Sequence, residues 1–122
     1  PMDDAAMQHQ GRDTWLLDHL GNRFQCLVFV DDVAHIDAST RSALQALSQQ
    51  AIAVEPLVIS LRPGAVEGMT VLVDDRGLFA KRYDAKPGSV WLARPDQHVC
   101  ARWRRFDADA VRAALAHATC NA

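Results

Sequence analysis

Hydrophobic positions along this chain gather into short apolar runs and helical stripes that are separated by polar turns. Residues 24–30 are almost continuously apolar, which predicts a strand buried on both faces. A helix is expected from a cap at Asp37 or Ser39 to about Gln50, followed by a second apolar strand over residues 54–60. A strand, a helix and a strand with short joints predict a right-handed parallel crossover.

The second half of the chain adds a different set of elements. In order, they are an extended piece at 69–73, a turn at 74–77, a short helix at 78–83, strands at 89–94 and 98–104, and a last helix capped by Asp107. The two strands should pair as an antiparallel hairpin. A parallel crossover followed by a hairpin and a C-terminal helix resembles the thioredoxin arrangement, so we expect an α/β fold with a mixed central sheet and helices on both faces.

The start of the chain shows no hydrophobic period. Residues 1–13 are polar, so we expect a linker or disordered lead-in there, with the thioredoxin-like domain spanning 14–122. Pro1 precedes Met2, which is not an ordinary native start. We therefore expect a domain excised from a longer protein.

Composition limits the classes of partner. The chain has 122 residues, enough for one domain, and a formal net charge of −2. This charge argues against nucleic acid and anionic membranes as partners, and no apolar run approaches the ~20 residues that span a bilayer. The three cysteines are odd in number and widely spaced, which predicts reduced thiols rather than a disulfide framework. With polar and acidic first residues, unlike a secretory signal, this predicts a cytoplasmic protein.

Thiol chemistry is argued against by one missing residue type. Redox-active thioredoxins place a Cys-x-x-Cys pair where the first core strand meets the next helix, because the helix N-terminus lowers the thiol pKa. Here the corresponding segment, 31–40, contains no cysteine, which argues against disulfide exchange and peroxidase activity. Cys26 lies inside the first apolar strand, where a small buried hydrophobe is the favoured interpretation.

Two histidines stand in chemically suggestive places. His35 lies near Asp31, Asp32 and Asp37 and could act as a general base, although a polar helix-capping loop is the favoured interpretation. His98 and Cys100 alternate on an expected strand and could begin a metal site. A metal site needs a third or fourth ligand, and no second cluster has suitable spacing, so a plain strand is favoured. The chain also has no GxGxxG or Walker-type glycine loop for a nucleotide.

The expected closing hairpin carries aromatic and basic residues. The run 102–105 has the composition of a phosphate-binding strand, but it is short and Asp107 follows closely, so a solvated edge strand is favoured. Trp91 and Trp103 come from the two arms of the hairpin. We expect one of them in the core and the other at an interface.

Three segments carry a family resemblance. Residues 17–29 resemble a "D-x-L-G-x-x-F-x-L-L-V-F" motif, residues 73–83 a "D-x-x-G…R-Y" motif, and residues 87–103 a "P-G-x-x-L-x-R-P-D-x-x-V-A-x-R" motif. These motifs, in this order, are typical of the C-terminal domain of FAD-dependent aromatic hydroxylases of the phenol hydroxylase and 3-(3-hydroxyphenyl)propionate hydroxylase type. One departure is Gln97-His98, where that family more often has glycine and an aromatic residue.

The resemblance implies a structural and assembly domain that is not catalytic by itself. Upstream domains of the parent chain would bind FAD, NAD(P)H and a phenolic substrate, so we expect no cofactor in this domain, and a possible homodimer. The candidates for turn or interface roles are Pro87, Gly88, Trp91, Arg94, Pro95, Asp96, Arg102 and Trp103. Two alternatives stay open: a free-standing, redox-inactive thioredoxin-like binding protein, and a small enzyme that uses His35.

Overall fold

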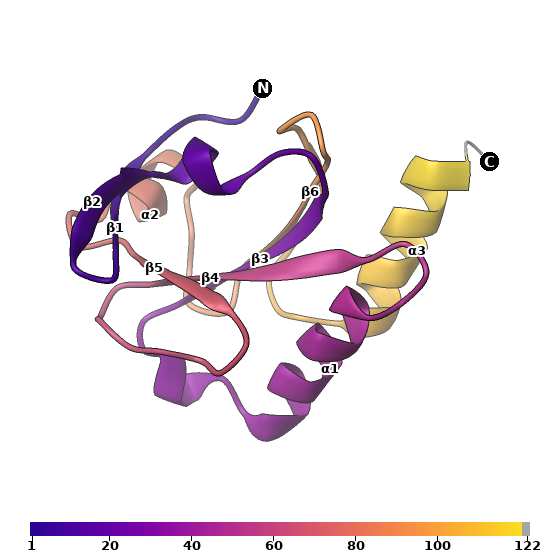
Figure 1. Cartoon of the computed structure of the whole chain (residues 1–122), viewed down its shortest axis with the longest axis horizontal. Coiled ribbons are helices and arrows are strands. Elements are labelled where there is room, and N and C mark those ends of the chain that lie inside the picture. The colour runs from indigo at the N-terminus through magenta and orange to yellow at the C-terminus, as the bar shows by residue number, and fades with distance from the viewer. Residues whose placement is uncertain (121–122) are drawn as a thin grey trace.

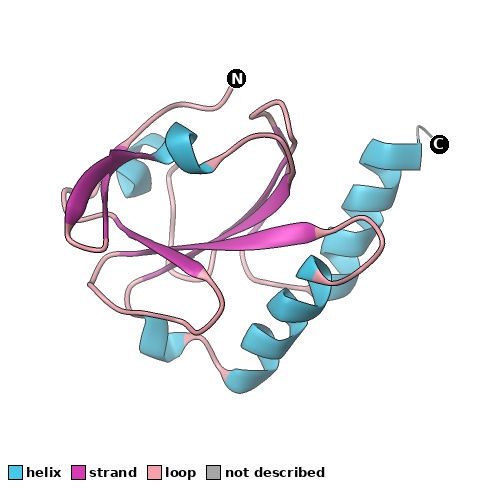
Figure 2. Ribbon diagram, viewed as in Figure 1, coloured by secondary structure: helices cyan, strands magenta, loops and turns pink. Residues whose placement is uncertain are grey.

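A computed structural model describes residues 1–120, which form a seven-stranded mixed sheet with helices on both faces (Figures 1 and 2). The strands are β1 (Ala6–His9), β2 (Arg12–Trp15), β3 (Phe24–Val30), β4 (Val54–Ser60), β5 (Thr70–Val73), β6 (Val90–Ala93) and β7 (Val99–Trp103). The helices are α1 (Ala38–Ser48), α2 (Leu78–Arg82) and α3 (Ala108–Cys120), with single 3-10 turns η1 (Leu16–His19) and η2 (Val33–His35). The strand order across the sheet is β2-β1-β5-β4-β3-β6-β7.

The centre of the sheet confirms the predicted topology. Strand β3 pairs in parallel with β4, and α1 connects them, so the crossover forms as expected. Strand β5 continues the parallel part beside β4. Strand β6 returns antiparallel against β3 and pairs with β7 as the closing hairpin. The sheet is therefore mixed, as a thioredoxin-like fold requires.

Side-chain alternation along β3 divides the core into two layers. Leu27 and Phe29 point to the layer covered by α2 and η1, whereas Cys26 and Val28 point to the layer covered by α1 and α3. All four side chains are almost fully buried, so both faces of β3 lie in the core. A strand that is buried on both faces explains why the sequence of β3 is an apolar run without alternation.

Aspartate carboxylates accept hydrogen bonds from backbone N–H groups at the starts of α1 and α2. Asp37 accepts a hydrogen bond at 2.8 Å from the backbone N–H of Thr40 and caps α1. The buried carboxylate of Asp74 accepts bonds from the N–H groups of Phe79 and Ala80, at 3.0 and 2.9 Å, which anchors the start of α2. Asp37 was one of the two caps predicted for α1, but the turn residues 74–77 gave no sign that Asp74 would be buried.

The structure differs from the prediction of a disordered lead-in over residues 1–13. Strands β1 and β2 form a hairpin in this segment, with a two-residue turn in which Gln10 and Gly11 both have positive φ. Met7 is 2% exposed and packs in the layer under α2. The turn is of the kind that Asn-Gly usually marks, so the glutamine in place of asparagine conceals it from sequence reasoning.

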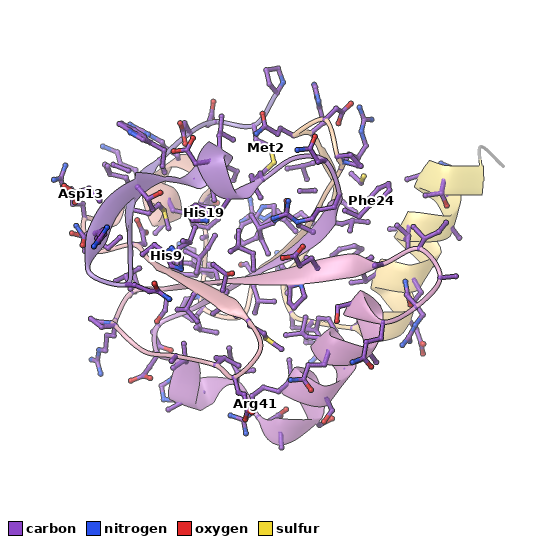
Figure 3. All side chains as sticks on the ribbon, viewed as in Figure 1. Met2, His9, Asp13, His19, Phe24 and Arg41 are labelled. Carbon is purple, nitrogen blue, oxygen red and sulfur yellow. The ribbon has the colours of Figure 1, made fainter. Side chains whose placement is uncertain are left out.

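The residues ahead of β1 are also held against the domain. Met2 is 7% exposed, and Figure 3 shows its side chain directed toward the sheet. Its backbone N–H donates to the carbonyl oxygen of Gln97 at 2.9 Å. Asp4 accepts bonds from the N–H groups of Ala5 and Leu17, so the polar side chain that suggested solvent exposure serves as an internal cap.

Candidate functional site

The loop between β3 and α1 is the place where related folds carry out thiol chemistry. Here Asp31 and His35 form an ion pair, with Oδ1 and Nδ1 2.7 Å apart. The pair raises the pKa of His35 and lowers that of Asp31, in each case mainly through the hydrogen bond between them. The His35 side chain is 65% exposed. The raised pKa favours the protonated imidazole, and the loop supplies caps as the favoured interpretation expected, because Asp32 and Asp37 accept hydrogen bonds from the N–H groups of Ala34 and Thr40.

Neither described cysteine side chain is placed for nucleophilic chemistry. Cys26 is fully buried on β3, and burial raises the pKa of its thiol to about 12. Cys100 is half-buried beside the α3 layer, and burial raises its pKa as well. Because the thiolate is the reactive form, these shifts disfavour nucleophilic chemistry at both thiols. The interpretation of Cys26 as a small buried hydrophobe agrees with this position; the side chain of Cys120 lies outside the described part of the structure.

The idea of a metal site at His98 and Cys100 gains no support from the geometry. A bulge between Leu92 and Ala93 shifts the register of the β6–β7 pair, so the simple alternation behind that idea does not hold. His98 precedes β7 and lies near the Asp96 carboxylate, with Nδ1 3.3 Å from Oδ1. Within residues 1–120 no group of three or more histidine, cysteine, aspartate or glutamate side chains is arranged to hold a metal ion.

A contact between two histidine rings joins the β1–β2 hairpin to η1. The rings of His9 and His19 meet edge to face with centroids 5.1 Å apart, and Figure 3 shows the two side chains close together. Thr14 Oγ1 lies 2.9 Å from His19 Nε2. Burial, and then the neighbouring His9, lowers the pKa of His19. Sequence reasoning missed this pair, because His9 fell in the segment expected to be disordered.

The closing hairpin is held at its base by the predicted Pro87-Gly88 step. Gly88 has a φ of 97°, and its N–H donates to the carbonyl oxygen of Phe29 at 2.7 Å. A Cβ at this position would make only an ordinary contact with the Arg104 carbonyl oxygen, at 3.5 Å, so the constraint is the backbone conformation. Only glycine adopts this conformation without strain, so Pro87-Gly88 fixes where the hairpin leaves the centre of the sheet.

The tip of the hairpin is a tight turn closed by an ion pair. Arg94 donates from Nε to Asp96 Oδ1 at 3.0 Å and from Nη2 to the other carboxylate oxygen. This bidentate contact lowers the pKa of Asp96 to about 2. Gln97 follows with a φ of 64°, the left-handed conformation that explains why the resembling family more often has glycine there. Its side chain compensates by donating to the carbonyl oxygens of Leu17 and Leu20.

The two tryptophans of the hairpin lie on opposite faces of the sheet. Trp91 is 2% exposed and packs edge to face against Phe79, with centroids 5.3 Å apart. Trp103 is half-buried and packs against the layer under α1 and α3. Trp91 is thus the core member of the pair, a choice that the sequence left open. Arg102 lies opposite Trp91 on β7 and covers its ring.

Arg102 and Trp103 also line a cleft with a volume of about 620 Å³. Its other lining residues are Asp84, Lys86, Ser89 and Arg104. We refer to these six residues as the basic cleft, since three of them are cations and one is an anion.

Residues 1–120 contain no helix long and apolar enough to cross a membrane.

Comparison with solved structures identifies the same fold inside flavoproteins. The flavin-dependent monooxygenase PieE, in complex with FAD and substrate, matches with a TM-score of 0.67 and 23% identity over 95% of this chain and 18% of that chain. Aklavinone-11 hydroxylase, in a ternary complex with FAD and aklavinone, matches with a TM-score of 0.63 and 22% identity over 90% of this chain and 18% of that one. This chain therefore spans about a fifth of the length of these monooxygenases.

The fold also occurs in small thiol enzymes. The thiol peroxidase from Chromobacterium violaceum matches with a TM-score of 0.75 and 16% identity over 96% of this chain and 84% of that chain. At this level of identity the match establishes the thioredoxin-like fold only. The comparison with curated proteins finds no match.

A protein-family comparison is more specific. The family described as the HcaD C-terminal domain matches residues 5–118, which is most of the chain and includes the β1–β2 hairpin. The predicted resemblance to the C-terminal thioredoxin-like domain of flavoprotein hydroxylases is confirmed by this match together with the two monooxygenase structures. This chain belongs to the HcaD C-terminal domain family.

Proposed function

We propose that this chain is the C-terminal structural and assembly domain of an FAD- and NAD(P)H-dependent monooxygenase that hydroxylates a phenolic or related aromatic compound. The observation that carries the proposal is the family match over residues 5–118, to a domain described by its C-terminal position. The occurrence of the same fold in two flavin-dependent enzymes supports it. In this proposal the upstream domains of the parent hold FAD, NAD(P)H and the substrate.

The domain itself contributes no catalytic residue in this proposal. The loop at the start of α1 contains no cysteine, and burial keeps the thiols of Cys26 and Cys100 protonated. The His35 imidazole is exposed, and its raised pKa favours the charged form. The role of the domain is therefore to pack on the enzyme body, and to contribute contacts to a cytoplasmic homodimer.

The closing hairpin is the part of the domain that we assign to these contacts. Pro87, Gly88, Arg94, Pro95 and Asp96 give the hairpin a fixed shape, because each stands at a constrained turn. Its free strand β7 ends the sheet and exposes Val99, which is 40% exposed. A rigid hairpin with an open strand edge can be covered by another domain.

The test begins with the size of the native polypeptide. An antibody raised against this chain is used to blot a lysate of the source cells, and a band several times heavier than 13.4 kDa is expected. The protein in that band is then purified and assayed for bound flavin and for NAD(P)H oxidation that depends on a phenolic substrate. A heavy protein without flavin would contradict the proposed enzyme while leaving the chain a domain of something larger.

The alternative is a free-standing, redox-inactive binding protein of thioredoxin-like fold. The observation in its favour is that this chain covers 84% of a thiol peroxidase, so a chain of this size can be nearly a whole protein of this fold. A band near 13.4 kDa in the same blot would support this alternative. Unchanged turnover of the parent after His35→Ala would remove the third hypothesis, a catalytic His35.

A further inference from the structure

Positive charge is concentrated in one stretch of this chain. Seven of the 13 lysine and arginine residues, but only two of the 15 aspartate and glutamate residues, lie between Lys81 and Arg105. The chain as a whole carries a formal net charge of −2, so the rest of the molecule is strongly acidic. Such a separation of charge creates a local field that attracts anionic groups to one part of the surface.

The fold brings two parts of this stretch together at the basic cleft. Lys86 comes from the loop after α2, while Arg102 and Arg104 come from β7 and the turn that follows it. The Nη2 group of Arg102 donates to the carbonyl oxygen of Asp84, which ties β7 to that loop. The run 102–105 therefore acts with a distant lysine, which sequence reasoning had no means to detect.

The central cation of the cleft is held in place before any partner arrives. The Arg102 guanidinium lies 5.0 Å from the centroid of the Trp91 ring, and Trp91 is itself locked in the core. The bond to Asp84 uses one of the five N–H groups of the guanidinium, so donors remain for a carboxylate. A positioned arginine loses less side-chain entropy on binding than a free one.

The anion in the cleft is weakly competitive. The Asp84 carboxylate lies 3.8 Å from Lys86 Nζ, and both side chains are at least 80% exposed. Exposed ion pairs of this kind contribute little, so Lys86 can exchange Asp84 for an incoming carboxylate at small cost. The left-handed φ of Asp84, at 47°, follows from its position just after α2 and directs the loop around the cleft.

The backbone of the cleft is unsuited to a phosphate group. Phosphate sites commonly present several free backbone N–H groups, but those of the 86–89 loop are already used. Lys86 N donates to Ser89 Oγ, Gly88 N to the Phe29 carbonyl and Ser89 N to the Lys86 carbonyl, while Pro87 has no N–H. Recognition must therefore come from the side-chain cations and from the edge of β7.

The position of the cleft beside a terminal strand favours a polypeptide. Strand β7 is the last strand of the sheet, so one side of its backbone can pair with an added strand. A nucleic acid has no main-chain amide groups that could pair with the open edge of β7 in this way. An extended acidic segment can satisfy both features, with main-chain bonds to β7 and carboxylates that reach Arg102, Arg104 and Lys86.

We propose that the basic cleft and the adjoining edge of β7 form a docking site for an extended acidic segment of polypeptide. Its carboxylates pair with Lys86, Arg102 and Arg104, and its main chain lies along β7. The site belongs to this chain alone, so its test does not require the parent enzyme of the proposed function.

The test uses the 122-residue chain and a fluorescein-labelled synthetic peptide of alternating glutamate and threonine, with binding followed by fluorescence anisotropy. The double variant Lys86→Gln/Arg104→Gln removes two cleft cations and leaves the Arg102–Trp91 contact in place. Arg41→Gln/Arg76→Gln is the matched control, because it removes two exposed cations that do not line the cleft. Loss of two ion pairs is expected to weaken binding by on the order of tenfold in the first variant and by less than about twofold in the control.

Three further measurements keep the proposal open to refutation. Circular dichroism and thermal melting establish that each variant is folded. A peptide with glutamine in place of glutamate should bind at least roughly tenfold more weakly than the acidic peptide, and added salt should weaken only the acidic one. Equal weakening by the cleft and control variants, or tighter binding of a single-stranded oligonucleotide or of inorganic phosphate than of the acidic peptide, would overturn the proposal.

Discussion

Arg102 and Trp91 face each other across the β6–β7 pair, with the guanidinium carbon 5.0 Å from the centre of the indole ring. Trp91 also packs edge to face with Phe79 and Tyr83, so the arginine lies over a ring that belongs to an aromatic cluster of the core. The charged side chain of Arg102 thereby covers the hydrophobic ring of Trp91 near the edge of the sheet. This contact links the stability of the fold to the proposed docking site.

Replacement of Arg102 by glutamine should destabilise the domain by about 0.5–1 kcal/mol, because the cation–π contact and the cover over Trp91 are lost. The free energy of unfolding is measured in urea from tryptophan fluorescence. Arg104→Gln is the control, because Arg104 is exposed and lies over no aromatic ring within residues 1–120. Equal stability of the two variants would show that the stacked arginine has no special role.

Gln97 allows the cost of a left-handed residue to be separated from the value of its hydrogen bonds. Gln97→Ala loses the bonds to Leu17 and Leu20 and keeps the unfavourable φ, so we expect a loss of about 1–3 kcal/mol. Gln97→Gly loses the same bonds but adopts a φ of 64° freely, so it should be more stable than the alanine variant by about 1 kcal/mol. Thermal melting compares them, and an alanine variant as stable as the glycine variant would contradict the proposed strain.

Asp74 should be more important than its neighbour Asp75, although the two look alike in the sequence. Asp74→Ala leaves the N–H groups of Phe79 and Ala80 without their acceptor in a buried place, which should cost about 1–3 kcal/mol. Asp75→Ala changes an exposed side chain, so its free energy of unfolding should lie within about 0.5 kcal/mol of that of the unsubstituted 122-residue chain. Chemical denaturation of both variants measures the difference.

The Cys26 thiol should resist modification for as long as the domain stays folded. Burial raises its pKa to about 12, so almost no thiolate is present at neutral pH. In a Cys100→Ser/Cys120→Ser variant, Ellman's reagent should react with Cys26 only on addition of denaturant. Rapid reaction in the native state would mean that β3 opens readily, and would also weaken the argument against thiol chemistry.

The Asp31–His35 pair should make stability depend on pH within a defined window. The pair raises the folded-state pKa of His35 above its ordinary value of 6.5. The contribution of His35 to the stability of the fold is therefore complete below pH 6.5 and is lost as pH rises through the folded-state pKa. The lowered pKa of Asp31 gives a contribution that is present above 3.8 and is lost as pH falls.

The difference in stability between the unsubstituted 122-residue chain and His35→Gln should therefore be largest between pH 3.8 and pH 6.5, the ordinary pKa values of aspartate and histidine. It should become smaller at alkaline pH. It is measured by denaturation at several pH values, with His117→Gln as a control for the general effect of losing a histidine. Both members of the pair are exposed, so the difference is small and salt should reduce it. A constant difference across the pH range would mean that the ion pair does not form in solution.

The central part of the fold could be predicted because its signals are local. The apolar run of β3 and the cap at Asp37 each act through neighbouring residues, and the structure has both where they were expected. The absence of a cysteine at the start of α1 is equally plain from the sequence. Local patterning therefore predicted the order of the elements from β3 onward and argued against thiol chemistry.

The missed features depend on contacts between residues that are distant in the chain. Asp4 looks like a solvent-exposed residue until Leu17 supplies its partner, and Gln97 looks unsuited to its turn until its side chain reaches Leu17 and Leu20. In the same way, Lys86 and Arg104 become one cleft only after the sheet forms. These pairings have no period and no motif, so hydrophobic patterning cannot reveal them.

The bond from Met2 to Gln97 joins the beginning of the chain to the tip of its closing hairpin. A probe attached at residue 3 should therefore tumble with the whole domain and should not move independently on a flexible terminus. A spin label at that position would give the broadened spectrum of an immobilised group, and this spectrum would sharpen if the hairpin turn that carries the Gln97 carbonyl lost its shape. The first residues thus give an experimental handle on whether the far end of the hairpin is in place.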